Sequence, residues 1–290
     1  MLIRLGYDIQ FETVGEVPIV TLLNVHPSRE KDLREADELS VDPLIKMDSY
    51  LDTFGNRACR LLAPAGTIRF QNSTLIEDLG LPDLEGLDAP QIPVQQLPHD
   101  VLPFLMNSRY CEVDLLSNTA AELFWEAAPG WARVQAVCDW VHQKVTFGYE
   151  FSSPIRTALG VYTERVGVCR DFQHLAVTFC RALNIPARYA TGYLGDIGVV
   201  VAPSPMDFSA WFEVYLGDRW WTFDARHNVR RIGRVLMATG RDATDCAITT
   251  SFGRARLTSF RVVSDEVKHH SSPETGLDTA SPPLRESSQS

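Results

Sequence analysis

Hydrophobic positions in the first 78 residues fall into short runs that show no helical periodicity beyond two turns. β-Branched and aromatic residues are frequent in these runs, and a Pro-Ala-Gly sequence separates the last two. The runs cover residues 2–12, 17–25, 57–64 and 66–76. We therefore expect a small N-terminal β-sandwich over residues 1–78.

Two further segments lack any periodic pattern of hydrophobic residues. Residues 79–98 contain four prolines, which keep a chain semi-extended and are typical of a linker between domains. Residues 268–290 are rich in Ser and Pro and contain almost no large apolar side chains. We expect an inter-domain linker at 79–98 and a disordered tail at 268–290.

The remaining part of the chain, residues 99–267, has helical patterns first and strand-like runs afterwards. Apolar residues of 130–147 fall on one stripe, and segments 117–128 and 167–185 also have helical patterns. The expected strands are residues 186–194, 209–216, 219–225, 234–240 and 257–263. This order predicts an α+β core, in which an antiparallel sheet packs against the central helix.

Charge and composition exclude several classes of partner. A formal net charge of −10 disfavours nucleic acid and anionic membranes, because both are bound through clustered Lys and Arg. The N-terminus lacks a signal-peptide pattern, and no apolar run reaches the roughly 18 residues of a membrane span. Six cysteines without Cys-x-x-Cys spacing indicate reduced thiols of a cytoplasmic protein, and we expect no metal and no cofactor. No feature of the sequence indicates an oligomeric state.

One cysteine, Cys169, stands where the central helix is expected to begin. Gly167 permits a tight turn before it, and Val177, Cys180 and Leu183 form the apolar face of the helix. Unpaired backbone N–H groups and the helix dipole stabilise a thiolate, so we expect the pKa of Cys169 to lie below the ordinary value of about 8.5. The same N–H groups are suited to hold an oxyanion during acyl transfer. The alternative role for Cys169, and the expected role of the other cysteines, is that of a small buried apolar residue.

Two further candidate site residues, Ser209 and Asp224, lie on neighbouring expected strands. Residues 217–218, a Gly-Asp dipeptide suited to a hairpin turn, join these strands. This turn pairs Trp211 with Asp224 and makes Ser209 a diagonal neighbour of Asp224, about 7–8 Å away between Cα atoms. A histidine at 209 would bridge the Asp224 carboxylate and the Cys169 thiol, as an oriented imidazole base does. Serine is too short for this contact and accepts no proton near neutral pH. The sequence thus predicts an unfilled place for a proton acceptor between Cys169 and Asp224.

Three other histidines are candidates to replace the missing base. His174 follows Cys169 by five residues and should point to another side of the helix. His227 differs from Asp224 by an odd number, so on a continued strand it would project to the opposite face, unless a bulge follows Asp224. His142 belongs to the preceding helix, which spacing alone does not relate to Cys169. None is an evident base, and His227 is the strongest candidate of the three.

The chain resembles the transglutaminase-like superfamily in two segments, "TERVGVCRDFQHLAVTFCRALNIPARYATGYL" and "DFSAWFEVYLGDRWWTFDARHN". It is most similar to bacterial transglutaminase-like cysteine proteases that carry an N-terminal β domain. The resemblance covers the chain apart from its tail and implies a papain-like fold with a Cys–His–Asp triad. It implies that Cys169 is the nucleophile and Asp224 the orienting aspartate. Ser209 stands where the family motif "DFHAW" has histidine.

Two functions are compatible with these residues. The resemblance implies a cysteine protease or amidase with thiol acyl chemistry on peptide or protein substrates, strongly impaired here because Ser209 replaces the base. The alternative is a non-catalytic peptide- or protein-binding module that keeps the cleft. Trp211 and Asp171 are the candidate binding residues, Trp211 because it offers an apolar contact to a peptide. A thiol redox protein is disfavoured, because no resolving cysteine lies within a few residues of Cys169.

Overall fold

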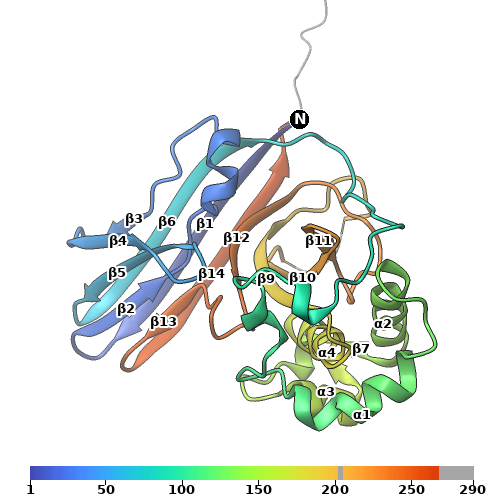
Figure 1. The fold of residues 1–290 in the computed structure, drawn as a ribbon. Helices are drawn as coiled ribbons and strands as arrows, with labels where there is room; N and C mark the ends of the chain where they lie inside the picture. Colours follow the sequence, from blue (N-terminus) through green and yellow to red (C-terminus); the bar gives the residue numbers. More distant parts are fainter. Residues whose placement is uncertain (202–204, 268–290) are drawn as a thin grey trace, which may run out of the picture.

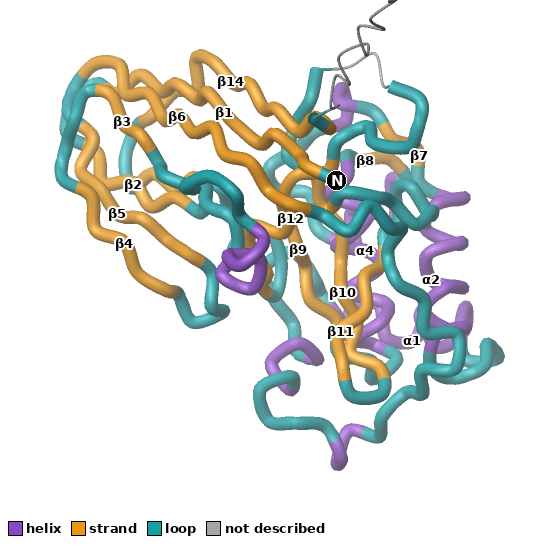
Figure 2. The backbone as a smooth tube through the Cα atoms, turned by 90° about the horizontal axis from the view of Figure 1, so that it is seen from above, coloured by secondary structure: helices purple, strands orange, loops and turns teal. Residues whose placement is uncertain are grey.

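The computed structural model describes residues 1–201 and 205–267, and a β-sandwich forms one side of the molecule (Figures 1 and 2). Its strands are β1 (Leu2–Thr13), β2 (Val17–Thr21), β3 (Ser40–Asp42), β4 (Met47–Leu51), β5 (Arg57–Ala63), β6 (Gly66–Glu77), β13 (Thr249–Ser251) and β14 (Ala255–Glu266). One sheet has the order β14-β1-β6-β3 and the other has the order β13-β2-β5-β4. Ile3 and Phe70 of the first sheet and Ile19 and Leu61 of the second are buried in one core cluster. The expected N-terminal sandwich is therefore present.

The end of the chain completes this sandwich. β14 pairs with β1 in antiparallel register, from Ile3 opposite Glu266 to Thr13 opposite Ala255, and β13 pairs with β2. The expected core, residues 99–267, thus contributes two strands to the N-terminal unit. The periodicity of a strand does not reveal its partner, because strand pairing depends on contacts far apart in the sequence. The tail that was expected to be disordered, residues 268–290, lies outside the described residues.

The second unit packs helices against a four-stranded antiparallel sheet with the order β11-β10-β9-β12, as Figure 1 shows. The strands of this sheet are β9 (Ala187–Leu194), β10 (Ser209–Leu216), β11 (Arg219–Phe223) and β12 (Arg234–Gly240). The α-helices are α1 (Val113–Phe124), α2 (Trp131–Lys144), α3 (Ala158–Glu164) and α4 (Cys169–Ala182), and a short pair, β7 (Thr146–Phe147) and β8 (Val166–Gly167), precedes α4. Short 3₁₀ helices are η1 (Pro27–Asp32), η2 (Val94–Gln96), η3 (Leu102–Leu105) and η4 (Tyr149–Phe151). The expected α+β class is confirmed.

The central helix α4 lies between the other helices and the sheet, and most of its side chains are buried. Asp171 fixes its start, because its Oδ2 accepts a hydrogen bond of 3.0 Å from the Val168 N–H. Gly167 is needed at this point, since a Cβ there would lie 2.6 Å from the Cβ of Asp171. Asn184, with φ of 62°, ends the helical turn before Pro186. These contacts place Cys169 at the first residue of α4.

The hairpin of β10 and β11 has the expected turn. Leu216 pairs with Arg219 around residues 217–218, and Gly217 has the positive φ of 64° that such a turn requires. The ladder continues to the pair Phe212–Phe223. Asp224 is consequently the first residue after β11.

Hydrogen bonds and close packing hold the segment 79–98 against the surface of the second unit. The N–H of Trp131 donates to the carbonyl of Ala89, and the N–H of Gly217 donates to that of Pro90. Gly86 packs so closely on Trp221 that a Cβ would lie 2.6 Å from the indole ring. This expected linker is thus attached to the helices and the hairpin along its length. In the part of the chain that the structure describes, no helix is both long and apolar enough to span a membrane.

Candidate functional site

Cys169 lines a small cavity of about 80 Å³ at the N-terminal end of α4. We call this space the cysteine cavity. Asp207 and Ser209, where β10 begins, and Arg226 and His227, in the turn after β11, also line it. The remaining lining residues are Tyr149, Leu194, Asp196, Pro205, Met206, Phe208 and Arg231. The structure therefore brings Cys169 and Ser209 to one cavity.

The thiol of Cys169 has a raised pKa. Burial raises it to about 11, and the negative charge of Asp207 acts in the same direction. The guanidinium of Arg226 and backbone hydrogen bonds from Ala210 and Arg170 oppose this increase but are outweighed. The expected lowering by the helix terminus is therefore wrong, because desolvation exceeds it. At pH 7 the thiol is therefore protonated in nearly all molecules.

Substitution of Asp207 by Asn should accelerate the alkylation of Cys169. Burial raises the pKa of the Asp207 carboxyl, yet its ionised form still disfavours a neighbouring thiolate. We expect the rate with iodoacetamide at pH 8 to increase about three- to tenfold, followed by peptide mass spectrometry of Cys169. Asp218→Asn removes the same charge from the exposed hairpin turn and should leave the rate unchanged. An equal increase in both variants would contradict a local effect of Asp207.

Ser209 occupies the first position of β10 and pairs with Gly192 of β9. Its backbone carbonyl accepts a hydrogen bond from Thr191, whereas its Oγ is buried without a hydrogen-bond partner among the described residues. A buried hydroxyl without a partner costs about 1–3 kcal/mol and is uncommon in native proteins. Ser209 therefore makes no polar connection between Cys169 and Asp224.

Asp224 contacts an imidazole ring, that of His227. The Nδ1 of His227 lies 2.9 Å from the Oδ2 of Asp224. The Oδ1 of Asp224 accepts backbone N–H groups from Arg226 at 3.0 Å and from His227 at 3.1 Å, so the chain turns back at once. The parity argument for His227 assumed a continued strand and is wrong for this reason. The His227 ring thus lies beside Asp224 and lines the cysteine cavity, whereas the sequence predicted no imidazole there.

Asp224 is ionised although only 2% of its side chain is exposed. Burial alone would raise the pKa of this carboxyl, but Arg234 and the hydrogen bonds of His227 hold it well below its ordinary range. Arg234 Nη2 lies 2.9 Å from Oδ2, and Nε2 of Gln173, one turn after Cys169, lies 3.1 Å from Oδ1. A carboxylate only accepts hydrogen bonds, so Nδ1 of His227 is the donor in this contact.

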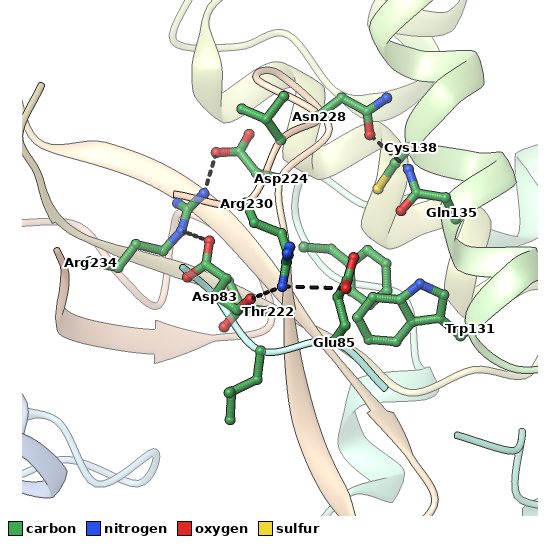
Figure 3. A pocket seen from close by; sticks show the side chains of 13 residues that line it. Asp83, Glu85, Trp131, Gln135, Cys138, Thr222, Asp224, Asn228, Arg230 and Arg234 are labelled. Carbon is green, nitrogen blue, oxygen red and sulfur yellow. Dashed lines mark hydrogen bonds and ion pairs between the residues drawn. The ribbon is translucent and has the colours of Figure 1, made fainter. Parts of the chain in front are cut away.

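Arg234 also ties Asp224 to the proline-rich segment. Its Nε donates to Oδ2 of Asp83 at 2.8 Å, and Figure 3 shows the guanidinium between the two carboxylates. These side chains line a second cavity of about 290 Å³ together with Trp131 and Cys138. Asp224 lines this second cavity and not the cysteine cavity. The His227 ring, which contacts Asp224, lines the cysteine cavity. Arg234 and Asp83 were not predicted as site residues: Asp83 is distant from Asp224 in the sequence, and Arg234 begins the next strand, β12, whose place in the sheet no local pattern reveals.

The two other histidines lie outside the lining of the cysteine cavity. His174 is buried between the rings of Tyr110 and Tyr189, with ring centroids 4.9 and 5.2 Å away. Burial lowers the pKa of His174 to about 3, so this imidazole stays neutral. Nδ1 of His142 lies 2.7 Å from the carbonyl oxygen of Arg226. His227 is therefore the imidazole that meets both Asp224 and the cavity.

The two candidate binding residues occupy different environments. Trp211 borders a third cavity of about 690 Å³ between the sandwich, segment 79–98 and the second unit. It is only 2% exposed and Arg234 lies over its ring, so the apolar peptide contact expected of it is not offered in this structure. Asp171 is fully buried and bonds to Val168 and Arg170 at the start of α4. Its position is that of a residue that shapes the helix start. Within residues 1–201 and 205–267, no group of three His, Cys, Asp or Glu side chains could hold a metal ion.

Comparison with known proteins places this geometry in a family. A sequence model of the Transglutaminase-like superfamily matches residues 117–225. The chain also matches a crystal structure described as a "Putative Cysteine Protease" from Cytophaga hutchinsonii, with 30% identity over 99% of this chain and 94% of that one, and a TM-score of 0.79. The chain belongs to the transglutaminase-like superfamily. The expected resemblance is thereby confirmed for nearly the whole length of this transglutaminase-like chain.

Two further proteins are similar to part of this chain. Uncharacterized protein ML0607 of Mycobacterium leprae is 29% identical over 117 residues, which are 39% of this chain. The matched region spans 42% of the length of that relative. The periplasmic domain of TgpA from Pseudomonas aeruginosa, bound to ethylmercury, is 15% identical over 76% of this chain and 75% of that chain, with a TM-score of 0.39. This last likeness is too weak to bear on the site.

Proposed function

We propose that this transglutaminase-like chain uses Cys169 for thiol acyl chemistry on peptide or amide substrates, at a rate lowered by serine at position 209. The sulfur would attack an amide carbonyl, and water or an amine would then release the acyl group. Backbone N–H groups at the first turn of α4 are suited to stabilise the oxyanion. The proposal is carried by one observation: Cys169 begins a buried helix and shares a cavity with Ser209 and with the turn after Asp224.

The lowered rate follows from the protonation state of the thiol. With a pKa of about 11, Cys169 is protonated at neutral pH and must lose its proton during the attack. Ser209, which occupies the motif position of the base, accepts no proton in this pH range. A positioned base typically contributes about 10²–10⁴-fold to the rate, so turnover should fall by this order.

A peptide-binding module without turnover is the second candidate. The cavity of about 690 Å³ favours it, since Trp211, Glu213 and Arg231 line a space large enough for several side chains. Arg231 lines the cysteine cavity as well.

Labelling with electrophilic peptides separates the two candidates. A panel of peptide vinyl sulfones should form a covalent adduct with the parent chain, mapped to Cys169 by mass spectrometry, and none with Cys169→Ala. At equal concentration the best peptide should react at least about tenfold faster than iodoacetamide, because binding places the electrophile near the sulfur. A parent chain that binds the peptides in calorimetry but forms no adduct would favour the binding module.

A further inference from the structure

We infer that His227 replaces the absent β10 histidine as the proton acceptor and donor for Cys169, acting through a water molecule in the cysteine cavity. This inference rests on the proposed thiol chemistry. The motif would supply its imidazole from position 209, whereas in this chain the imidazole comes from the turn that follows Asp224. The resulting group is Cys169, His227 and Asp224.

The position of His227 has the features of an oriented base. Its Nδ1 contacts the Oδ2 of Asp224 at 2.9 Å, and its ring lines the same cavity as Cys169. Because 23% of the side chain remains exposed, the ring is reachable from solvent as well as anchored. A carboxylate that holds Nδ1–H leaves Nε2 as the basic nitrogen, which is the arrangement of an imidazole base.

Asp224 is itself rigidly held, so the imidazole has little freedom. Its carboxylate accepts hydrogen bonds from Arg234 and Gln173 and from the N–H groups of Arg226 and His227. These bonds fix both the carboxylate and the backbone of the turn. A group of this kind orients the ring in the free protein, before substrate binds.

A water molecule is needed between the two reacting groups. Cys169 and His227 form no direct hydrogen bond in the described structure, but they line one cavity of about 80 Å³. A water molecule occupies about 30 Å³, and a base acting through one water is within the usual geometry of general-base catalysis. The cavity therefore has room for a relay.

In each step His227 exchanges a proton, through water, with Cys169 or with the substrate. As Sγ bonds to the carbonyl carbon, its proton passes to the water and a proton of that water passes to Nε2 of His227. The carbonyl oxygen becomes the oxyanion. When it collapses, the C–N bond breaks and the amine leaves with a proton returned from His227 through the water. A second water then attacks the thioester, gives its proton to Nε2, and the thiol regains that proton as the acid product leaves.

Asp207 is the competing acceptor in the same cavity. Its carboxylate lies close enough to raise the pKa of Cys169. Asp207 interacts electrostatically with Arg226, whereas the His227 ring is oriented by the Asp224 carboxylate. The observations favour His227.

The test compares His227→Asn in the parent chain and in Ser209→His. The Asn amide keeps an N–H for Asp224 but has no basic nitrogen. On a peptide p-nitroanilide, His227→Asn should lower the Cys169-dependent kcat of the parent about 10- to 100-fold with little change in KM, and free imidazole should restore part of it. In Ser209→His the same substitution should cost less than about threefold, since the imidazole introduced on β10 then acts as base. Asp207→Asn and the surface control Asp218→Asn should not reproduce this loss.

The remaining outcomes contradict either the role of His227 or the proposed function. Equal losses in both backgrounds, without imidazole rescue, would assign His227 a structural role and overturn the inference. A parent without Cys169-dependent turnover would refute the proposed function of this chain even beside an active Ser209→His variant, whereas a parent that turns over substrate equally well with His227→Asn would overturn the inference alone. A loss confined to Asp207→Asn would transfer the role to Asp207. If neither background shows Cys169-dependent turnover, the proposed function itself fails.

Discussion

Ser209→His should raise Cys169-dependent turnover of a peptide amide by about 10²–10⁴-fold, the usual contribution of a positioned general base. Position 209 and Cys169 line the same cavity, so an imidazole introduced there would reach the thiol. It would accept the thiol proton and then protonate the leaving amine. The substitution would also remove the buried Oγ of Ser209, which lacks a hydrogen-bond partner in the described structure.

The measurement is kcat/KM on a peptide panel for four proteins: the parent, Ser209→His, Ser209→Asn and Ser209→His combined with Cys169→Ala. Ser209→Asn is the matched control, because it adds a polar side chain that accepts no proton near neutral pH. Only Ser209→His should be faster than the parent, and Cys169→Ala should abolish the gain. A gain that survives Cys169→Ala, or one that Ser209→Asn reproduces, would refute the assignment of position 209.

Arg234→Met should lower the free energy of unfolding by about 3–5 kcal/mol, the typical cost of leaving a buried charge without its partner. The Arg234 side chain is 7% exposed and joins Asp224 at 2.9 Å to Asp83 at 2.8 Å. Its removal leaves two carboxylates with one counter-charge fewer in a buried place. Methionine keeps much of the volume over Trp211, so the loss reports mainly the charge.

Arg230→Met provides the matched control for this measurement. Arg230 also pairs with a carboxylate, that of Glu85 at 3.3 Å, but both side chains are more than 40% exposed. Exposed pairs contribute about 0–1 kcal/mol, so urea unfolding of Arg230→Met should differ little from the parent. Similar losses in the two variants would show that the Arg234 network contributes no more than a surface pair.

Local sequence signals predicted the elements that carry the site. The glycine before Cys169 and the apolar spacing after it predicted a helix that begins near Cys169, and α4 begins there. The Gly-Asp dipeptide predicted the turn that pairs Leu216 with Arg219. Both signals depend on neighbours within a few residues, which is why they could be interpreted without the fold.

Features that depend on distant contacts were not predictable in this way. Asp83 and Arg234 meet across 151 positions, and β14 joins β1 from the opposite end of the chain. The pKa of Cys169 is set by burial, which a position at a helix terminus does not reveal. His227 did leave a local signal, because an Asp that ends a strand often bonds the N–H groups two and three residues later and reverses the chain.

The central claim is that no imidazole directly stabilises the Cys169 thiolate. In the described structure no imidazole forms a hydrogen bond with this thiol, and His227, which lines the same cavity, is proposed to act only through water. The most direct test is the rate of Cys169 alkylation by iodoacetamide from pH 6 to pH 10 in the parent and in Ser209→His. In the parent the rate should rise about tenfold per pH unit without levelling, since the pKa of the thiol is about 11. In Ser209→His it should level at a clearly lower pH, because an imidazolium beside the sulfur favours the thiolate. A parent curve that levels below pH 8 would contradict the account.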